Sequence, residues 1–269
     1  MSKGDLEALR REVSRLERGS SPVASERFST GSVQLDAALH GGLSRGALHE
    51  VFAAQTADEP SASGFAVMLA VRASAKRPVV WVRQDFAGIE AGEIYAPGLA
   101  ELGLSPDRLI VVRASDGPSV LRAGEEAARC PPLGAVLIEP WGAPKALDLV
   151  ASRRLALAAA RSNVPLFMVR AGAQPEPSAA LTRWRVRAAL STALEADAPG
   201  HPAFNVELLR DRAGAAGRNW IVEWDRDSGI FKDRIGKKRS ATDPPSLSGG
   251  MVSLPAGGSH HARHARRAV

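Results

Sequence analysis

Short apolar segments recur along the first two thirds of the chain, and a helical pattern separates each one from the next. We expect strands at residues 47–52, 78–83, 109–113, 134–139 and 164–170, and helices at residues 33–39, 64–74, 119–129 and 145–162, with a further helix ending at 99–102. Strands that are apolar throughout are typical of a parallel sheet that is buried on both faces. The sequence therefore predicts an α/β sandwich of three layers, in which helices cover a mostly parallel sheet.

The pattern changes after residue 183. Three further β-segments are expected at residues 184–190, 203–210 and 219–224. The last two are joined by a short segment with two glycines, Arg212-Ala-Gly-Ala-Ala-Gly-Arg218, which is typical of a hairpin turn. We therefore expect a C-terminal antiparallel hairpin at one end of the sheet.

Composition excludes several classes of protein. The 269 residues are 45% hydrophobic and 24% charged, as in a soluble globular protein with a sizeable core. No apolar run is long enough to cross a bilayer, and the first residues lack the apolar stretch of a secretory signal. One cysteine, Cys130, excludes an internal disulfide and a multi-cysteine zinc site. We expect a cytoplasmic protein.

The N-terminal segment has the pattern of an amphipathic helix. Over residues 5–18 the apolar side chains are spaced three, four and three residues apart, which places Leu6, Leu9, Val13 and Leu16 on one stripe. A glycine- and serine-rich linker follows at residues 19–22. Two interpretations stay open: the stripe packs on its own domain, or it contacts a partner or a second copy. We predict the contact role and divide the chain into this segment (1–20), a core (21–235) and a tail (236–269).

Most of the net charge lies in the tail. The chain carries +6, and residues 236–269 hold six Lys or Arg against one Asp, or +5, which leaves +1 for the rest. The basic residues of the tail are Lys237, Lys238, Arg239, Arg263, Arg266 and Arg267. Few apolar side chains accompany them, so we expect this tail to be disordered. Any DNA affinity should reside largely there, weak and independent of sequence, and a folded basic face is not implied.

The run at residues 28–51 resembles the segment that precedes the first core strand of RecA-type ATPases. The resemblance rests on Ser29-Thr-Gly31, Leu35-Asp36, Leu39, Gly41-Gly42-Leu43, Arg45-Gly46 and Glu50-Val51, and it extends over roughly residues 28–232. It implies a RecA-like fold. In that family a phosphate loop with Gly-Lys-Ser/Thr should follow within a few residues.

The expected phosphate loop is missing. Residues 52–65 contain no Lys, although a working loop needs one on the terminal phosphates and a Ser or Thr on Mg²⁺. Asp58 and Glu59 instead place two negative charges in this segment, where they would repel a triphosphate. We therefore expect no ATP hydrolysis, no catalytic residue, no cofactor and no bound metal.

The other positions of the family's nucleotide site are also altered. The resemblance places Glu139 where the family has the Asp that holds Mg²⁺ through water. Without the loop groups we favour a polar strand end that caps the next turn over a metal ligand. At the end of the strand that carries the family's water-activating Glu, Gln84 and Asp85 lie nearby, but no Glu stands in register.

Aromatic and histidine residues leave weaker hypotheses. Trp220 and Trp224 share one face of a strand and, with arginines nearby, would suit stacking on nucleic acid. Packing under the sheet is the favoured alternative. The six histidines form no recognisable site: His40 and His49 flank a glycine turn, His201 lies in a loop, and three lie in the tail.

The whole combination resembles the ImuA family, the RecA-like partners in a bacterial damage-inducible mutagenesis cassette. The resemblance implies a non-catalytic role in SOS-induced translesion DNA synthesis. The implied partners are ImuB, an inactive relative of Y-family polymerases, an error-prone C-family polymerase reached indirectly, and RecA. Association with the nucleoid after DNA damage, and self-association, are also expected.

Two alternatives stay open beside that role. A cell-division inhibitor resembling SulA would share a degenerate RecA-like core, and it would cause filamentation on overexpression without DNA damage. A divergent RecA-type ATPase or recombinase would bind ATP or ADP tightly.

Overall fold

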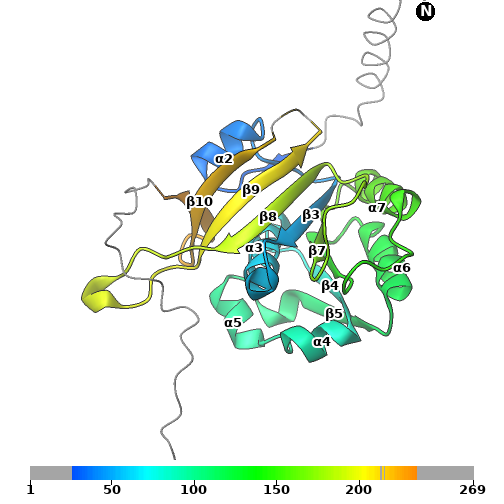
Figure 1. Ribbon diagram of the computed structural model, residues 1–269, viewed down its shortest axis with the longest axis horizontal. Coiled ribbons are helices and arrows are strands. Elements are labelled where there is room, and N and C mark those ends of the chain that lie inside the picture. The colour runs from blue at the N-terminus through cyan, green and yellow to red at the C-terminus, as the bar shows by residue number, and fades with distance from the viewer. Residues whose placement is uncertain (1–25, 213, 215, 235–269) are drawn as a thin grey trace, which may run out of the picture. The chain divides into compact units, whose positions relative to one another are not determined.

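The computed structural model describes residues 26–212, 214 and 216–234, and its central element is a nine-stranded sheet (Figure 1). The strand order is β11-β10-β9-β8-β3-β7-β6-β4-β5. Six strands run parallel to one another: β3 (Leu48–Ala53), β4 (Val79–Gln84), β5 (Leu109–Ala114), β6 (Ala135–Glu139), β7 (Leu166–Arg170) and β8 (Thr182–Ala188). Three more continue the sheet in antiparallel fashion: β9 (Ala203–Asp211), β10 (Arg218–Asp225) and β11 (Ile230–Asp233).

Helices cover both faces of the parallel part. On one face, α3 (Glu59–Ser74) contributes Phe65 and Leu69 to a core cluster that includes Val51 of β3. On the other face, α6 (Gly117–Ala128) and α7 (Leu149–Ser162) contribute Val120 and Leu155 to a second cluster. This arrangement confirms the predicted three-layer α/β sandwich with a C-terminal antiparallel hairpin, which β9 and β10 form.

Smaller elements complete the description. They are β1 (Arg27–Phe28), β2 (Leu43–Ser44), α2 (Val33–Ala38), α4 (Asp85–Ala91), α5 (Ala96–Glu101) and the 3₁₀ helices η1 (Thr56–Asp58), η2 (Pro106–Arg108) and η3 (Glu195–Asp197). None of the helices in the described ranges has the length and apolar character needed to cross a membrane. The amphipathic segment at residues 5–18 and the basic residues of the 236–269 tail lie outside the described residues, so their roles and the boundaries after residues 20 and 235 stay predictions.

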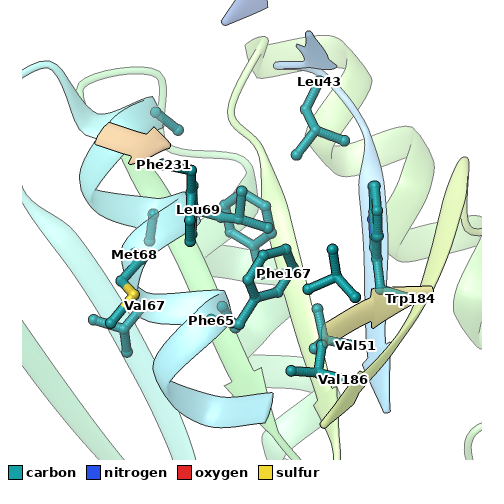
Figure 2. Packing of buried hydrophobic residues seen from close by; sticks show 14 of the residues in the cluster. Leu43, Val51, Phe65, Val67, Met68, Leu69, Phe167, Trp184, Val186 and Phe231 are labelled. Carbon is teal, nitrogen blue, oxygen red and sulfur yellow. The ribbon is translucent and has the colours of Figure 1, made fainter. Parts of the chain in front are cut away.

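The core on the α3 side is rich in aromatic side chains (Figure 2). The Phe65 ring lies 5.2 Å from that of Phe231 and 6.0 Å from that of Trp184, measured between ring centroids. Phe231 also meets Trp224 edge-on at 4.9 Å. Each such side chain, when fully buried, contributes roughly 1.5–3 kcal/mol or more to folding. These contacts join α3 to both the parallel and the antiparallel parts of the sheet.

The entry motif Ser29-Thr-Gly31 is held by the Asp36 carboxylate. One oxygen of Asp36 accepts hydrogen bonds from the backbone N and Oγ1 of Thr30, at 2.9 and 2.8 Å, and the other accepts from Ser29 Oγ at 2.6 Å. Ser32 caps α2 and also donates to Asp233 at the end of β11. The motif on which the RecA resemblance rests therefore joins the two ends of the described core.

Some element boundaries differ from the predicted ones. The helix expected at 64–74 begins at Glu59, because Pro60 suits the first turn of a helix. The helix expected from residue 145 begins at Leu149, since the Asp148 carboxylate caps it by accepting from Ala151 N at 2.7 Å. The sequence analysis missed α4 and β11. β11 has four residues, and only its pairing with β10 identifies it as a strand.

His49 is buried within β3 and is held as a neutral ring. Its Nε2–H donates to the Ser44 carbonyl at 2.9 Å, and its Nδ1 accepts from the Thr182 hydroxyl at 2.8 Å. Thr182 in turn accepts from the Trp184 indole at 2.9 Å. Protonation would turn Nδ1 into a donor and remove the acceptor that the Thr182 hydroxyl uses. Burial lowers the pKa of His49 from 6.5 to about 4.

We predict that His49 makes stability depend on pH between about 6.5 and 4. The unfolded chain binds a proton on His49 in this window and the folded chain does not, so the stabilisation is complete above pH 6.5 and is lost as pH falls. The loss reaches about 3 kcal/mol near pH 4. Urea unfolding at pH 7, 5.5 and 4 should show a flatter dependence for His49→Gln than for the native chain.

The matched control is His40→Asn. His40 is exposed and has a φ of 54°, which Asn tolerates. This variant should keep the native pH dependence. Equal slopes for native and His49→Gln proteins would contradict the prediction.

Candidate functional site

The connection from β3 to α3 occupies the place where the RecA resemblance puts a phosphate loop. β3 ends at Ala53, and only Ala54 and Gln55 precede η1, which leads directly into α3 at Glu59. A phosphate loop needs a run of backbone N–H groups turned toward the ligand at a helix N-terminus. Here Pro60 in the first turn has no N–H to offer.

The chain's own carboxylates occupy the N-terminal end of α3. Asp58 Oδ1 accepts from Ala188 N at 2.9 Å, and Glu59 Oε1 accepts from Gly172 N at 3.0 Å. Both side chains are buried, and Asp58 ends η1 while Glu59 begins α3. The positive end of the helix dipole therefore has two internal anions beside it, in the position that a phosphate would need.

Glu139, at the end of β6, forms a buried ion pair with Arg83 of β4. Arg83 Nε lies 2.6 Å from Glu139 Oε2, and the two residues are direct partners across the β4–β6 ladder. Ser63 Oγ of α3 donates to the other oxygen, Oε1, at 3.3 Å. The favoured hypothesis, that Glu139 caps the next turn, was therefore wrong. A guanidinium neutralises the carboxylate that the family resemblance assigns to a metal.

Arg83 is fixed by more than its ion pair. Its Nη1 donates to the Gly92 carbonyl at 3.1 Å and its Nη2 to the Ala87 carbonyl at 3.4 Å, and its guanidinium lies 5.6 Å from the centre of the Trp81 ring. Arg83 is 7% exposed and Glu139 is 2% exposed. With donors satisfied on several sides and little access to solvent, this pair has the properties of a structural contact.

The neighbouring polar residues also serve the fold. Gln84 accepts from Trp141 N at 3.0 Å through its side-chain oxygen. Asp85 pairs with Arg113 at 3.0 Å on the surface. Gln84 lines a hollow of about 80 Å³ together with Arg83, Glu93 and Arg113, and its side-chain oxygen is already engaged by Trp141 N. In the described ranges, no group of three or more His, Cys, Asp or Glu side chains is placed to hold a metal ion.

A second buried charge cluster lies at β3, β7 and β8. Glu50 Oε2 accepts from Arg183 Nε at 2.9 Å and from Ser178 Oγ at 2.8 Å, and Glu50 Oε1 lies 3.5 Å from Arg170 Nη1. Both guanidiniums also lie over the Phe52 ring. Burial lowers the pKa of Arg170, and the nearby Glu50 carboxylate opposes that shift. Arg170 keeps two nitrogens, Nε and Nη2, without a hydrogen-bond partner.

The two tryptophans pack in the core, and the histidines of the described residues form no metal site. Trp224 is fully buried and Trp220 packs against the same core cluster, which confirms the alternative to a stacking surface. His40, His49 and His201 do not come together with other candidate ligands in the described part of the chain. Cys130 is exposed and unpaired.

Arg83 and Glu50 are the site residues that the sequence analysis missed. Each is a charged residue within or at the end of an otherwise apolar strand segment, Val-Val-Trp-Val-Arg and Leu-His-Glu-Val-Phe. Because a lone charge is too costly to bury, this signal indicates a partner on an adjacent strand. It does not identify the partner, since the strand order is not contained in either segment.

Known proteins resemble the chain in sequence and in fold. Two proteins called Protein ImuA, from two strains of Caulobacter vibrioides, are each 36% identical over 198 residues, which are 68% of this chain and 77% of the relative. The crystal structure of the RadB recombinase superposes with a TM-score of 0.50 at 16% identity, covering 77% of this chain and 99% of the other, and it shows a shared RecA-like fold. No protein-family model matches the chain.

We predict that breaking the Arg83–Glu139 pair destabilises the fold. Arg83→Met would leave the Glu139 carboxylate buried without its cation, which lowers the free energy of unfolding by about 3–5 kcal/mol. Replacing both residues, with Arg83→Met and Glu139→Leu, should recover most of that loss. Urea denaturation at pH 7 measures both effects.

Arg113→Met is the matched control, because Arg113 pairs with Asp85 and Glu93 on the surface. It should change stability little. The prediction is contradicted if Arg83→Met is no more destabilising than Arg113→Met.

Proposed function

The chain belongs to the ImuA family, and from that premise we propose that it is a non-catalytic accessory protein of error-prone translesion DNA synthesis. It acts in the SOS response through contacts with an ImuB-like relative of Y-family polymerases. Through that partner it reaches an error-prone C-family polymerase, and RecA is a further partner. The protein works in the cytoplasm and joins the nucleoid when DNA is damaged.

The observation that carries the non-catalytic role is the internal neutralisation of the nucleotide site. Phosphoryl transfer depends on cations and N–H groups placed around the developing phosphate charge. At the positions where the RecA resemblance would supply them, Arg83 neutralises Glu139, and the carboxylates of Asp58 and Glu59 lie at the start of α3. These contacts favour an accessory role over a divergent ATPase.

The contact surface that we assign to the partner is the N-terminal stripe of Leu6, Leu9, Val13 and Leu16. Four apolar side chains on one face, fully buried in an interface, would contribute on the order of 6–10 kcal/mol before ordering costs. The Gly-Ser-Ser-Pro linker at residues 19–22 lets such a helix extend away from its own domain. The same stripe would serve self-association.

We predict that the purified protein hydrolyses no ATP, with or without single-stranded DNA. Turnover should stay at the background rate, and millimolar ATP with Mg²⁺ should leave the melting temperature unchanged, because no binding to the folded state means no stabilisation. A turnover rate that Ser63→Ala or Glu139→Gln abolishes, in a variant that still melts cooperatively, would show a working site and overturn the proposal.

We predict that Leu9→Asp with Val13→Asp abolishes binding to the ImuB-like partner and leaves the melting temperature of the isolated protein unchanged. The two carboxylates would interrupt the apolar stripe, and pull-down with the partner measures the effect. The control is Arg10→Asp with Arg11→Asp, which changes the solvent side of the same helix. Loss of thermal stability in the stripe variant would instead assign the stripe to the core of its own domain.

A further inference from the structure

Three arginines, one from α7 and two from the end of β9, lie around the segment at residues 178–181. We call them the arginine trio: Arg153 of α7, Arg210 of β9, and Arg212 just after β9. Arg210 Nη1 donates to the Ser178 carbonyl at 3.3 Å, and the backbone N of Arg212 donates to the Leu181 carbonyl at 3.0 Å.

The position of Arg153 follows from the contact that the preceding residue of α7 makes with the same segment. Ser152, which precedes Arg153, accepts a hydrogen bond at 3.0 Å from Ala179 N. The electrostatics agree with this placement, since partial burial and then the charges of Arg210 and Arg153 lower the pKa of Arg212. Arg153, Arg210 and Arg212 therefore all lie beside the segment at residues 178–181.

Among the described residues, the trio differs from its neighbours in having no ion pair with a carboxylate. Arg154, the next residue of α7, pairs with Glu125, and Arg183 of β8 pairs with Glu50. No ion pair links Arg153, Arg210 or Arg212 to an acid within residues 26–212, 214 and 216–234. Like charges held close together raise the free energy of the folded state, and a bound anion relieves that repulsion.

A polar sheet face continues from the trio along β8 and β9. Arg185 of β8 is partly exposed and forms an ion pair with Glu207 of β9 at 3.0 Å, while the exposed Arg187 lies opposite Asn205. α3 packs on the opposite face, where Trp184 and Val186 join its core cluster. In Figure 1, strands β8, β9 and β10 lie without a helix in front of them. The exposed Arg187 shows that solvent reaches this part of the face.

We propose that the arginine trio and the adjoining face of β8 and β9 bind the phosphate backbone of nucleic acid. Guanidinium groups match phosphate oxygens in geometry and charge, and the exposed Arg187 of β8 adds a further guanidinium to those of the trio. Trp220 and Trp224 belong to the core on the α3 side, so this face has no tryptophan for base stacking. Binding is therefore independent of sequence and sensitive to salt.

This inference goes beyond the proposed function and does not depend on it. The charge distribution along the sequence did not imply a folded basic face, and this proposal places one on the sheet. The net charge of +1 outside the tail is a sum over residues 1–235, and positive and negative residues can still be separated locally within it. The face and the basic tail are separate candidates for DNA contact, so a test has to separate them.

The experiment uses the full chain in which the six basic tail residues are replaced by Gln, so that the tail no longer contributes charge. In this background we compare Arg153→Gln/Arg212→Gln with the control Arg122→Gln/Arg161→Gln, which removes two exposed arginines of α6 and α7 outside the trio. The probe is a fluorescein-labelled oligothymidylate, and anisotropy is measured over a range of NaCl concentrations. Melting temperatures establish that all variants are folded.

We expect the trio variant to bind at least about tenfold more weakly than the control, as the loss of charge-assisted contacts implies. The slope of log affinity against log salt should fall by about 1.4, for two phosphate contacts on a single strand. Arg153→Lys/Arg212→Lys should retain most of the binding, because the charge is kept. Equal affinities of trio variant and control, or no binding in the tail-neutral background, would overturn the proposal.

Competition decides between nucleic acid and other anions. Unlabelled oligothymidylate should displace the probe at far lower charge concentration than inorganic phosphate or polyglutamate. Displacement by polyglutamate at equal charge concentration would assign the face to an acidic protein segment, and this result would overturn the nucleic-acid proposal.

Discussion

Charge at the carboxyl edge of the parallel sheet is the constraint on which the rest of this structure depends. In a nucleotide-binding relative of this fold, ligand and metal would share the neutralisation of that edge. Here the Arg83–Glu139 pair joins β4 to β6 at that edge, and deeper in the sheet Glu50 of β3 pairs with Arg183 near the start of β8. Because buried charges are costly alone, strand order, register and side-chain identity have to be correct together.

At the start of α3, buried carboxylates are again satisfied inside the protein, here by backbone N–H groups. Asp58 and Glu59 fix the turn after β3 by accepting from Ala188 N, at the end of β8, and from Gly172 N, just after β7. A loop that in a RecA-type ATPase would wrap a phosphate has become a clamp between three strand ends. The residues at the place of the expected phosphate loop therefore make internal contacts that hold three strands together.

The sequence predicted the layers and most strands well. A continuous apolar segment such as residues 134–139 indicates a buried strand by its own composition, without knowledge of its neighbours in the sheet. It did not predict the partner of Glu139, because β4 and β6 are neighbours in the sheet but are separated in sequence by β5 and α6. The arginine trio was missed for a related reason. Residues 153, 210 and 212 meet only after α7 and β9 are both placed against the segment at 178–181.

The bond between Ser32 and Asp233 spans 201 residues and sets an order of events during synthesis. The Ser29–Asp36 turn leaves the ribosome early, but the strand that covers it is among the last parts of the core to be made. At roughly 5–20 residues per second, the interval is on the order of 10–40 s. For that time the aromatic cluster lacks Phe231, and the growing chain exposes the surface that β11 later closes. Completion of this core is therefore limited by translation, and a nascent chain that stalls before residue 230 would be a natural target for chaperones.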